Sequence, residues 1–330
     1  MSKDVLVLDA DSIAYKAAAA NESRSITASH KEKDEVSEWS NRTAFRAFLK
    51  ENNLSHTEVD YEIADVQDPR HISYGQSLVR EIIKGYHTKT GVVDHEIYIG
   101  GADNFRDKIP LPTKYKGKRV DTLRPVQLKD IRSFMINDLG AIVVNGEEVD
   151  DVGSKRAYEG WKADEGKVIQ VTEDKDALQC SGWLFNPAKM ASPIYIQGFG
   201  EIHREGTGAK GTGRLWLYYQ ALYGDSVDCY HGADLWKAEG AVQGIKRQFG
   251  EVAAYNVLSG CKTDAEAWLT LYSQYSSWYP EPVTYTAWDG KEYTKDAVDI
   301  MQMYFDCAFM RRWDNDRINC REVLTKLGVI

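Results

Sequence analysis

The stretch VLVLDADS, residues 5–12, decides the fold. Val5 to Leu8 is an unbroken aliphatic run without the polar alternation of a half-exposed strand, which predicts a strand buried on both faces, as in a parallel sheet. This strand leads directly into two acids, Asp9 and Asp11. Because ligands of open parallel sheets bind at the carboxyl ends of the strands, these acids lie where a binding site is expected.

The same kind of segment recurs along the chain and alternates with helical patterns. Further apolar runs that end at glycine or polar residues occupy residues 97–100, 141–145 and 168–172. Helical periodicity covers residues 75–86, 126–139 and 149–162. Alternating strands and helices predict an α/β fold, with a parallel sheet, right-handed crossovers and helices on both faces.

Two stretches interrupt this alternation. Residues 26–40 predict an inserted hairpin, and residues 193–214 predict a second hairpin that ends in a flexible, glycine-rich connection from residue 206. Beyond it the pattern is mainly helical, with helices expected at 215–223, 241–249, 265–275 and 295–312. The predicted domains are therefore residues 1–205, holding the sheet and the hairpin, and residues 206–330, a mainly helical region that contributes Asp225 and Asp228.

Composition restricts the class of protein. With 43% hydrophobic and 28% charged residues the chain is expected to fold around a core. Its formal net charge of -9 argues against a protein that coats nucleic acid through bulk positive charge, but leaves room for a local basic groove. The five cysteines include no CxxC pair, and we see neither a signal peptide nor a membrane-spanning run, so a reducing cytoplasm is expected.

The acids fall into four groups at predicted strand or helix junctions. They are Asp9 and Asp11; Glu147, Glu148, Asp150 and Asp151; Asp174 and Asp176; and Asp225 and Asp228. For any one pair, a stabilising position at a helix start, which contributes up to about 1 kcal/mol, is an adequate explanation. Four groups converging on one sheet edge would repel each other unless cations were bound. Oxygen-only ligands favour Mg²⁺ or Mn²⁺.

A basic segment offers the cations that a nucleic-acid substrate of such a metal site would need. Two divalent ions can activate a water and clamp a phosphodiester, which suits nucleic-acid cleavage. The residues predicted to contact DNA are Arg106, Lys114, Tyr115, Lys116, Lys118 and Arg119, and Tyr115 is expected to stack on a terminal base. A merely solvated loop is the alternative explanation of this segment.

Five short motifs, in order, resemble the phage and bacterial 5′-nucleases, a family that includes flap endonucleases and podophage 5′-to-3′ exonucleases. The motifs are VLDAD at 7–11; FR at 105–106 with YKGKR at 115–119; EVDD at 148–151; TEDKD at 172–176; and GDSVD at 224–228. The chain departs from flap endonucleases at 229–240, where their glycine-rich helix-hairpin-helix turn is missing.

The resemblance implies a PIN-like fold with two metal ions. Asp9, Glu148, Asp150 and Asp174 would lie closest to the first ion, and Asp151, Asp176, Asp225 and Asp228 toward the second. As catalytic residues it implies Asp9 and Asp150 with Lys116 and Arg119, which contact the phosphate. The implied partners are 5′ ends, flaps or duplex ends of DNA and RNA–DNA hybrids, in phage replication or recombination in an infected cell's cytoplasm.

Two rival functions compete with a nuclease. DADS at residues 9–12 also resembles the nucleophile motif of haloacid-dehalogenase-type phosphatases, in which Asp9 attacks phosphate and Asp11 is the general acid. That hypothesis gives no role to Glu148, Asp150 or the basic segment. The other rival is a catalytically silent DNA-binding or scaffolding protein, which predicts no metal dependence.

Overall fold

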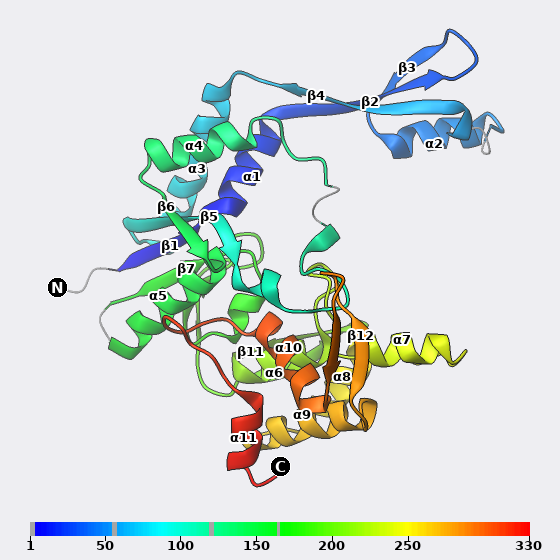
Figure 1. Cartoon of the computed structure of the whole chain (residues 1–330). Helices are drawn as coiled ribbons and strands as arrows, with labels where there is room; N and C mark the ends of the chain where they lie inside the picture. The colour runs from blue at the N-terminus through cyan, green and yellow to red at the C-terminus, as the bar shows by residue number, and fades with distance from the viewer. Residues whose placement is uncertain (1–3, 55–57, 119–121, 164–165) are drawn as a thin grey trace. The chain divides into compact units, whose positions relative to one another are not determined.

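A six-stranded sheet forms the centre of the fold. The computed structural model describes residues 4–54, 58–118, 122–163 and 166–330. The sheet has the order β6-β5-β1-β7-β8-β9, from β1 (Val5–Asp9), β5 (Asp94–Asn104), β6 (Ile142–Gly146), β7 (Val168–Val171), β8 (Gly182–Phe185) and β9 (Ile194–Ile196). All neighbours are parallel except β8 and β9, which are antiparallel. Figure 1 labels the neighbours β6, β5, β1 and β7. The predicted α/β fold is confirmed.

β1 lies inside the sheet, as its aliphatic run predicts. Leu6 and Leu8 are fully buried, and β1 has a strand on either side. Leu8 is in register with Ile97 of β5 and Val171 of β7. The parallel strands β1 and β7 therefore end at the same edge, and the residues that come after them are brought together there.

Helix α5 (Val149–Ala163) packs closely against this sheet because it presents glycine to it. Gly153 and Gly160 are buried, and a Cβ placed on Gly160 would lie 2.7 Å from the Cβ of Val168. Cβ atoms do not approach so closely, and Val168 is held in the interior strand β7. The glycines thus allow the first turn of α5, with its acids, to approach the ends of the strands.

Replacing Gly160 by Ala is expected to destabilise the protein by about 1–3 kcal/mol, because the added methyl forces apart α5 and β7. Urea unfolding measures the loss. The matched control is Gly260→Ala, where a Cβ meets nothing within 4 Å and the backbone does not require glycine. Equal stability of the two variants would contradict close packing at Gly160.

The C-terminal helices share one aromatic-rich core. They are α6 (Gly213–Tyr223), α7 (Asp234–Val242), α8 (Glu251–Leu258), α9 (Asp264–Trp278), α10 (Ala297–Ala308) and α11 (Cys320–Lys326). The helices expected near 215–223, 265–275 and 295–312 are confirmed. The one expected at 241–249 is wrong: α7 ends at Val242, and Gly244 adopts a left-handed conformation with a φ of 72°.

The glycine-rich run is not the flexible connection that its composition predicts. Its residues form β11 (Gly208–Thr212), which pairs with β10 (Glu201–Glu205), and Gly213 begins α6. Gly211 and Gly213 lie against neighbouring backbone: a Cβ on Gly211 would lie 2.6 Å from the Glu201 carbonyl oxygen, and one on Gly213 would lie 2.7 Å from the Gly200 Cα. Close backbone approach, rather than flexibility, explains these two glycines.

The chain divides into two compact units. None of the boundaries between them lies near residue 205, where the sequence predicts a domain boundary. One unit holds residues 1–10, 86–122 and 141–330, so that the sheet and the C-terminal helices belong together. The other holds residues 11–85 and 123–140. It contains α1 (Ala10–Ala20) from Asp11 on, α2 (Arg42–Glu51), most of α3 (Ile72–Thr90) and α4 (Leu128–Asn137).

The second unit contains the predicted hairpin. β2 (Glu22–His30) pairs antiparallel with β3 (Val36–Trp39) and, on its other side, with β4 (Tyr61–Pro69), which the sequence did not reveal. Helix α2 covers one face, with Phe45 and Leu49 packed on Ile26 and Ala28. The helices expected at 75–86 and 126–139 correspond to α3 and α4.

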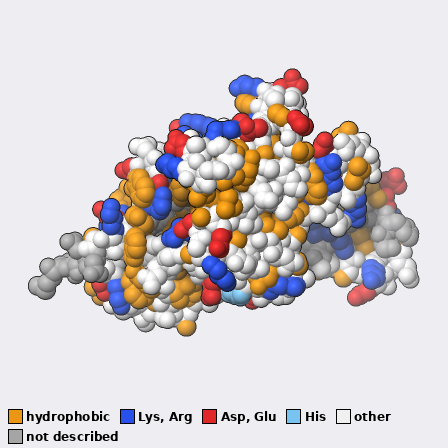
Figure 2. All heavy atoms as spheres, turned by 90° about the horizontal axis from the view of Figure 1, so that it is seen from below, with side chains coloured by type: hydrophobic (Ala, Val, Ile, Leu, Met, Phe, Trp, Pro, Cys, Tyr) orange, Lys and Arg blue, Asp and Glu red, His pale blue; other side chains and the backbone are white. Residues whose placement is uncertain are grey.

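Charged and hydrophobic side chains are mixed on one face of the molecule. On the face drawn in Figure 2, Lys and Arg side chains are interspersed with Asp and Glu among hydrophobic side chains. The net charge of -9 is therefore not displayed there as one acidic surface. Among the described helices, none combines the length and apolarity needed to span a lipid bilayer.

Candidate metal centre

One group of carboxylates surrounds Asp150. Asp9 ends β1, Glu148 and Asp150 stand at the start of α5, and Asp174 comes after β7. Thr172 donates a hydrogen bond to Asp150 Oδ1 at 2.8 Å. The pKa of Asp150 is nevertheless raised well above its usual range, first by burial and then by the negative charges of Asp174, Asp9 and Glu148. The sheet edge thus gathers four carboxylates from three segments.

A second group consists of Asp176, Asp225 and Asp228. All three are buried, and one carboxylate oxygen of each lies within 4.8 Å of the others. Burial raises the pKa of Asp176, and Asp174 adds to the effect; Asp176 also donates its backbone N–H to Asp174 Oδ1 at 2.8 Å. Asp174 therefore links the two groups into one acidic centre.

A tight turn presents Asp225 and Asp228 together. The backbones of Asp225 and Tyr230 pair across this turn, and Asp225 Oδ1 accepts a hydrogen bond from the Val227 N–H at 2.7 Å. Cys229 takes a left-handed backbone conformation, with a φ of 64°, to close it. The turn directs both carboxylates toward Asp176.

Lys116 bridges the two groups of acids. Its Nζ contacts Glu148 Oε1 and lies 3.8 Å from Asp228 Oδ2, while its side chain stays 18% exposed. Its backbone is left-handed, with a φ of 53°, and its N–H donates to the Asp228 carbonyl at 2.9 Å. A non-glycine residue in this region is strained by about 1 kcal/mol, so the surrounding contacts hold Lys116 in place.

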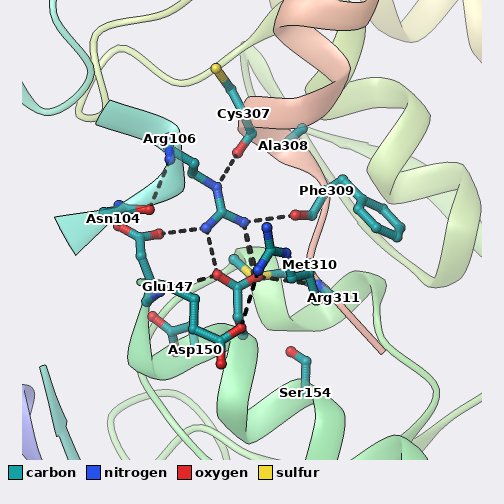
Figure 3. A network of polar contacts seen from close by, with 12 residues as sticks. Asn104, Arg106, Glu147, Asp150, Ser154, Cys307, Ala308, Phe309, Met310 and Arg311 are labelled. Atoms are coloured by element: carbon teal, nitrogen blue, oxygen red, sulfur yellow. Dashed lines mark hydrogen bonds and ion pairs between the residues drawn. The ribbon is translucent and has the colours of Figure 1, made fainter. Parts of the chain in front are cut away.

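Arg106 is the buried centre of a polar network (Figure 3). Its guanidinium, 0% exposed, donates to both Asp151 oxygens at 2.6 and 3.1 Å and to the carbonyls of Cys307 and Phe309 at 3.1 and 2.7 Å. Burial alone would raise the pKa of Asp151, but Arg106 outweighs it and lowers that pKa. The network ties the start of α5 to the end of α10.

This network corrects two expectations. Arg106 cannot contact DNA, because its side chain is fully buried. Asp151 is not placed as a metal ligand, because its carboxylate is neutralised by Arg106 and also accepts the backbone N–H groups of Glu148 and Arg311. In this structure its carboxylate holds the backbone of Glu148 and the guanidinium of Arg106.

Tyr115 is corrected in the same way. It is 3% exposed, and its hydroxyl lies 3.1 Å from Asp228 Oδ2 and 3.3 Å from Glu148 Oε2, so it cannot stack on a base. Lys114 and Lys118 are exposed, as DNA contacts require. Arg119 lies outside the described residues.

Other polar partners of the acids were not foreseen. Asn104 donates to Glu148 Oε1 at 3.0 Å, and Gln220 donates to Asp176 Oδ1. Lys175 pairs with Asp225 at 3.0 Å. Asn104 and Gln220 belong to no recognisable motif, so the sequence could not indicate their contacts. For Lys175, its place between Asp174 and Asp176 was the signal that could have indicated an ion pair with an acid of the centre.

No family model matches the chain, and no curated protein does. Solved structures of bacteriophage T5 proteins are similar to it. The T5 D15 protein co-crystallised with metal ions has a TM-score of 0.46 and 12% identity, covering 98% of this chain and 97% of that one. The T5 5′-exonuclease with bound zinc has a TM-score of 0.42 and 13% identity over 77% and 81%. A T5 D15 flap endonuclease complex with DNA and metal ions has a TM-score of 0.37 and 13% identity over 56% and 65%.

Proposed function

We propose that the chain is a divalent-metal-dependent nuclease that hydrolyses DNA phosphodiesters at 5′ ends or flaps. The observation that carries the proposal is the acidic centre, in which carboxylates of four chain segments meet at one sheet edge: Asp9, Glu148, Asp150, Asp174, Asp176, Asp225 and Asp228. With the motif resemblance, the proposed setting is phage DNA replication or recombination in the cytoplasm of an infected cell.

The donor set fits hard divalent cations. It offers only carboxylate oxygens, which suit Mg²⁺ or Mn²⁺ better than softer metals. The raised pKa values of Asp150 and Asp176 are consistent with this: burial raises both, and the negative charges of neighbouring carboxylates, Asp174 above all, raise them further. We assign Asp9, Glu148, Asp150 and Asp174 to a first ion, and Asp176, Asp225 and Asp228 to a second. When bound, such a pair activates a water and stabilises the leaving oxygen.

The protein's own residues position these acids and neutralise the phosphate. Tyr115 contacts Glu148 and Asp228 and so keeps the two groups in a fixed relation. The Lys116 ammonium lies at the partly exposed side of the centre, where it can pair with a substrate phosphate in place of Glu148. We assign Arg119 to the same phosphate, as the motif resemblance implies.

Lys116→Ala is expected to lower kcat about a hundredfold or more while changing KM little, because an interaction made mainly in the transition state is lost. Steady-state kinetics on a flap substrate separate the two constants. Lys118→Ala is the matched control: this nearby exposed lysine should affect KM alone. A Lys116→Ala effect confined to KM would reduce Lys116 to a substrate-binding role.

The proposed function is tested with a DNA duplex that carries a 5′ flap, labelled at the 5′ end in one sample and at the 3′ end in another. Cleavage from the 5′ side with Mg²⁺, absent with EDTA, is expected, and the product length distinguishes trimming from flap removal. An RNA–DNA hybrid in parallel tests the RNA activity.

Absence of cleavage in every strand would overturn the nuclease. Hydrolysis of a small phosphomonoester instead would support the phosphatase. The structure gives that rival little support, since Asp11, its general acid, forms an ion pair with Arg132. Glu148 and Asp174 would also have no task in it.

A further inference from the structure

A pocket of about 440 Å³ lies along α5, and its lining includes none of the acids of the acidic centre. It is formed by α5 between Val152 and Lys162 and by residues 312–314, with Val152, Lys155, Arg156, Tyr158, Glu159, Lys162, Arg312, Trp313 and Asp314 as its lining. A volume of this size lies in the range of small-molecule sites. None of these residues has a role in the proposed mechanism.

Aromatic side chains gather at this pocket and stay partly exposed. The Tyr158 ring centroid lies 5.7 Å from that of Trp313 and 5.2 Å from that of Trp161. Trp313 is 48% exposed and Trp161 38%. Arg312 lies over the Trp313 ring, 4.4 Å from its centroid, and is itself held by Asp316 at 2.7 Å. The indole is thus fixed in orientation while part of its surface remains accessible for stacking.

One cation of the lining is available to an anionic ligand. Lys155 pairs with Glu147 and Asp314, Arg156 with Glu96 and Glu159, and Arg312 with Asp316. Among the described residues, Lys162 is exposed and has no ion-pair partner. A cation near an accessible aromatic ring suits a ligand that is both anionic and planar, as each nucleotide of a single strand is.

Glu147 lies between the pocket and the acidic centre. Lys155 pairs with Glu147, the neighbour of Glu148, at 2.5 Å, and Arg311 approaches the same carboxylate at 3.5 Å. Figure 3 shows Glu147 and Arg311 beside the Arg106 network. From Asp151 to Tyr158 the helix rises about 10 Å, the length of roughly three stacked nucleotides.

We infer that this pocket binds single-stranded nucleic acid, with a base stacked on Trp313 and the backbone phosphates facing Lys162. The inference rests on the proposed function for its choice of ligand: a strand extending from the acidic centre along α5 reaches the pocket within a few nucleotides. The pocket would then retain a single-stranded part of the substrate or product.

The test measures binding by fluorescence anisotropy, with a labelled oligothymidylate of about twelve nucleotides. EDTA is present throughout, so that metal-dependent cleavage cannot occur. Trp313→Leu is expected to weaken binding roughly tenfold through lost stacking. Lys162→Ala should reduce the slope of log K against log salt by about 0.7, since one phosphate contact is lost. Lys246→Ala, an exposed lysine outside the pocket, is the control and should match the wild type.

Wild-type affinity and salt slope in Trp313→Leu and Lys162→Ala would overturn the inference, as would failure of the wild type to bind. If Trp313→Leu does not fold, as judged by its circular dichroism, the exposed Lys162→Ala decides alone. The flap-cleavage assay with Mg²⁺ runs separately. Cleavage without an effect of the pocket variants therefore rejects the pocket alone, whereas pocket-dependent binding without cleavage rejects the nuclease alone.

Discussion

Asp150→Asn is expected to lower the rate of Mg²⁺-dependent cleavage about a thousandfold or more. Bound metal contributes several kcal/mol to the transition state, and each step of about 1.4 kcal/mol is tenfold in rate. Asp150 lies among Asp9, Glu148 and Asp174, so an amide at this position would remove a central ligand of the proposed metal centre. The rate of flap cleavage at saturating Mg²⁺ measures the effect.

The same variant should fold well without metal. Because the pKa of Asp150 is raised in the folded state, its stability contribution is present at low pH and is lost as pH rises through that pKa. A neutral amide escapes this loss, so Asp150→Asn in EDTA at neutral pH should match or exceed the wild-type Tm. It should also lose the rise in Tm that Mg²⁺ produces in the wild type.

Asp138→Asn is the control for this substitution. Asp138 is exposed at the end of α4, outside the acidic centre, and its replacement should leave both cleavage and the effect of Mg²⁺ on Tm unchanged. Retained cleavage in Asp150→Asn would contradict the assignment of the metal centre. Unfolding of the variant in EDTA would contradict the electrostatic argument.

Arg106→Met is expected to destabilise the protein by about 3–5 kcal/mol, as is usual when one partner of a buried ion pair is removed. The substitution leaves Asp151 buried with its charge unpaired, and it leaves the carbonyls of Cys307 and Phe309 without their donor. Urea unfolding at pH 8 measures the loss. Arg156→Met, which breaks a half-exposed pair with Glu96, should lose less than about 1 kcal/mol.

The pH dependence of Arg106→Met identifies the cause. In the wild type the pKa of Asp151 is lowered, so its contribution to stability is present above the unfolded-state pKa and is lost as pH falls through the folded value. Without Arg106, burial raises that pKa instead, and the deficit should shrink as pH falls toward about 4. A second change, Asp151→Asn, should recover part of the stability at pH 8. A deficit independent of pH would point to lost packing alone.

The sheet could be predicted from sequence because its strands have a local signal. Strands covered on both faces are short apolar runs, and VLVL at 5–8 is one of four such runs that are neighbours in a single sheet. The acids at their ends could be placed at one edge, since parallel strands share a direction. Neighbours along the chain were sufficient evidence for these predictions.

Partners distant in sequence could not be predicted in this way. Arg106 and Tyr115 were expected to contact DNA because they stand in a basic segment. Nothing local shows that Arg106 pairs with Asp151 and with carbonyls about 200 residues away. The glycine-rich run misled for a related reason, since Gly211 and Gly213 allow close contact with the backbone of Glu201 and Gly200. Burial and long-range pairing decide these roles, and neither can be predicted from the residues next to them in the sequence.

The hydrogen bonds from Arg106 to the carbonyls of Cys307 and Phe309 have a consequence for folding during synthesis. Synthesis proceeds from the N-terminus, and chains tend to fold in that order. Asp9, Asp150 and Asp174 are therefore made long before the segment that supplies these acceptors. A nascent chain broken off before residue 307 would hold a buried guanidinium without them. Assembly of the acidic centre is thus expected to wait until residues 307–309 have been made.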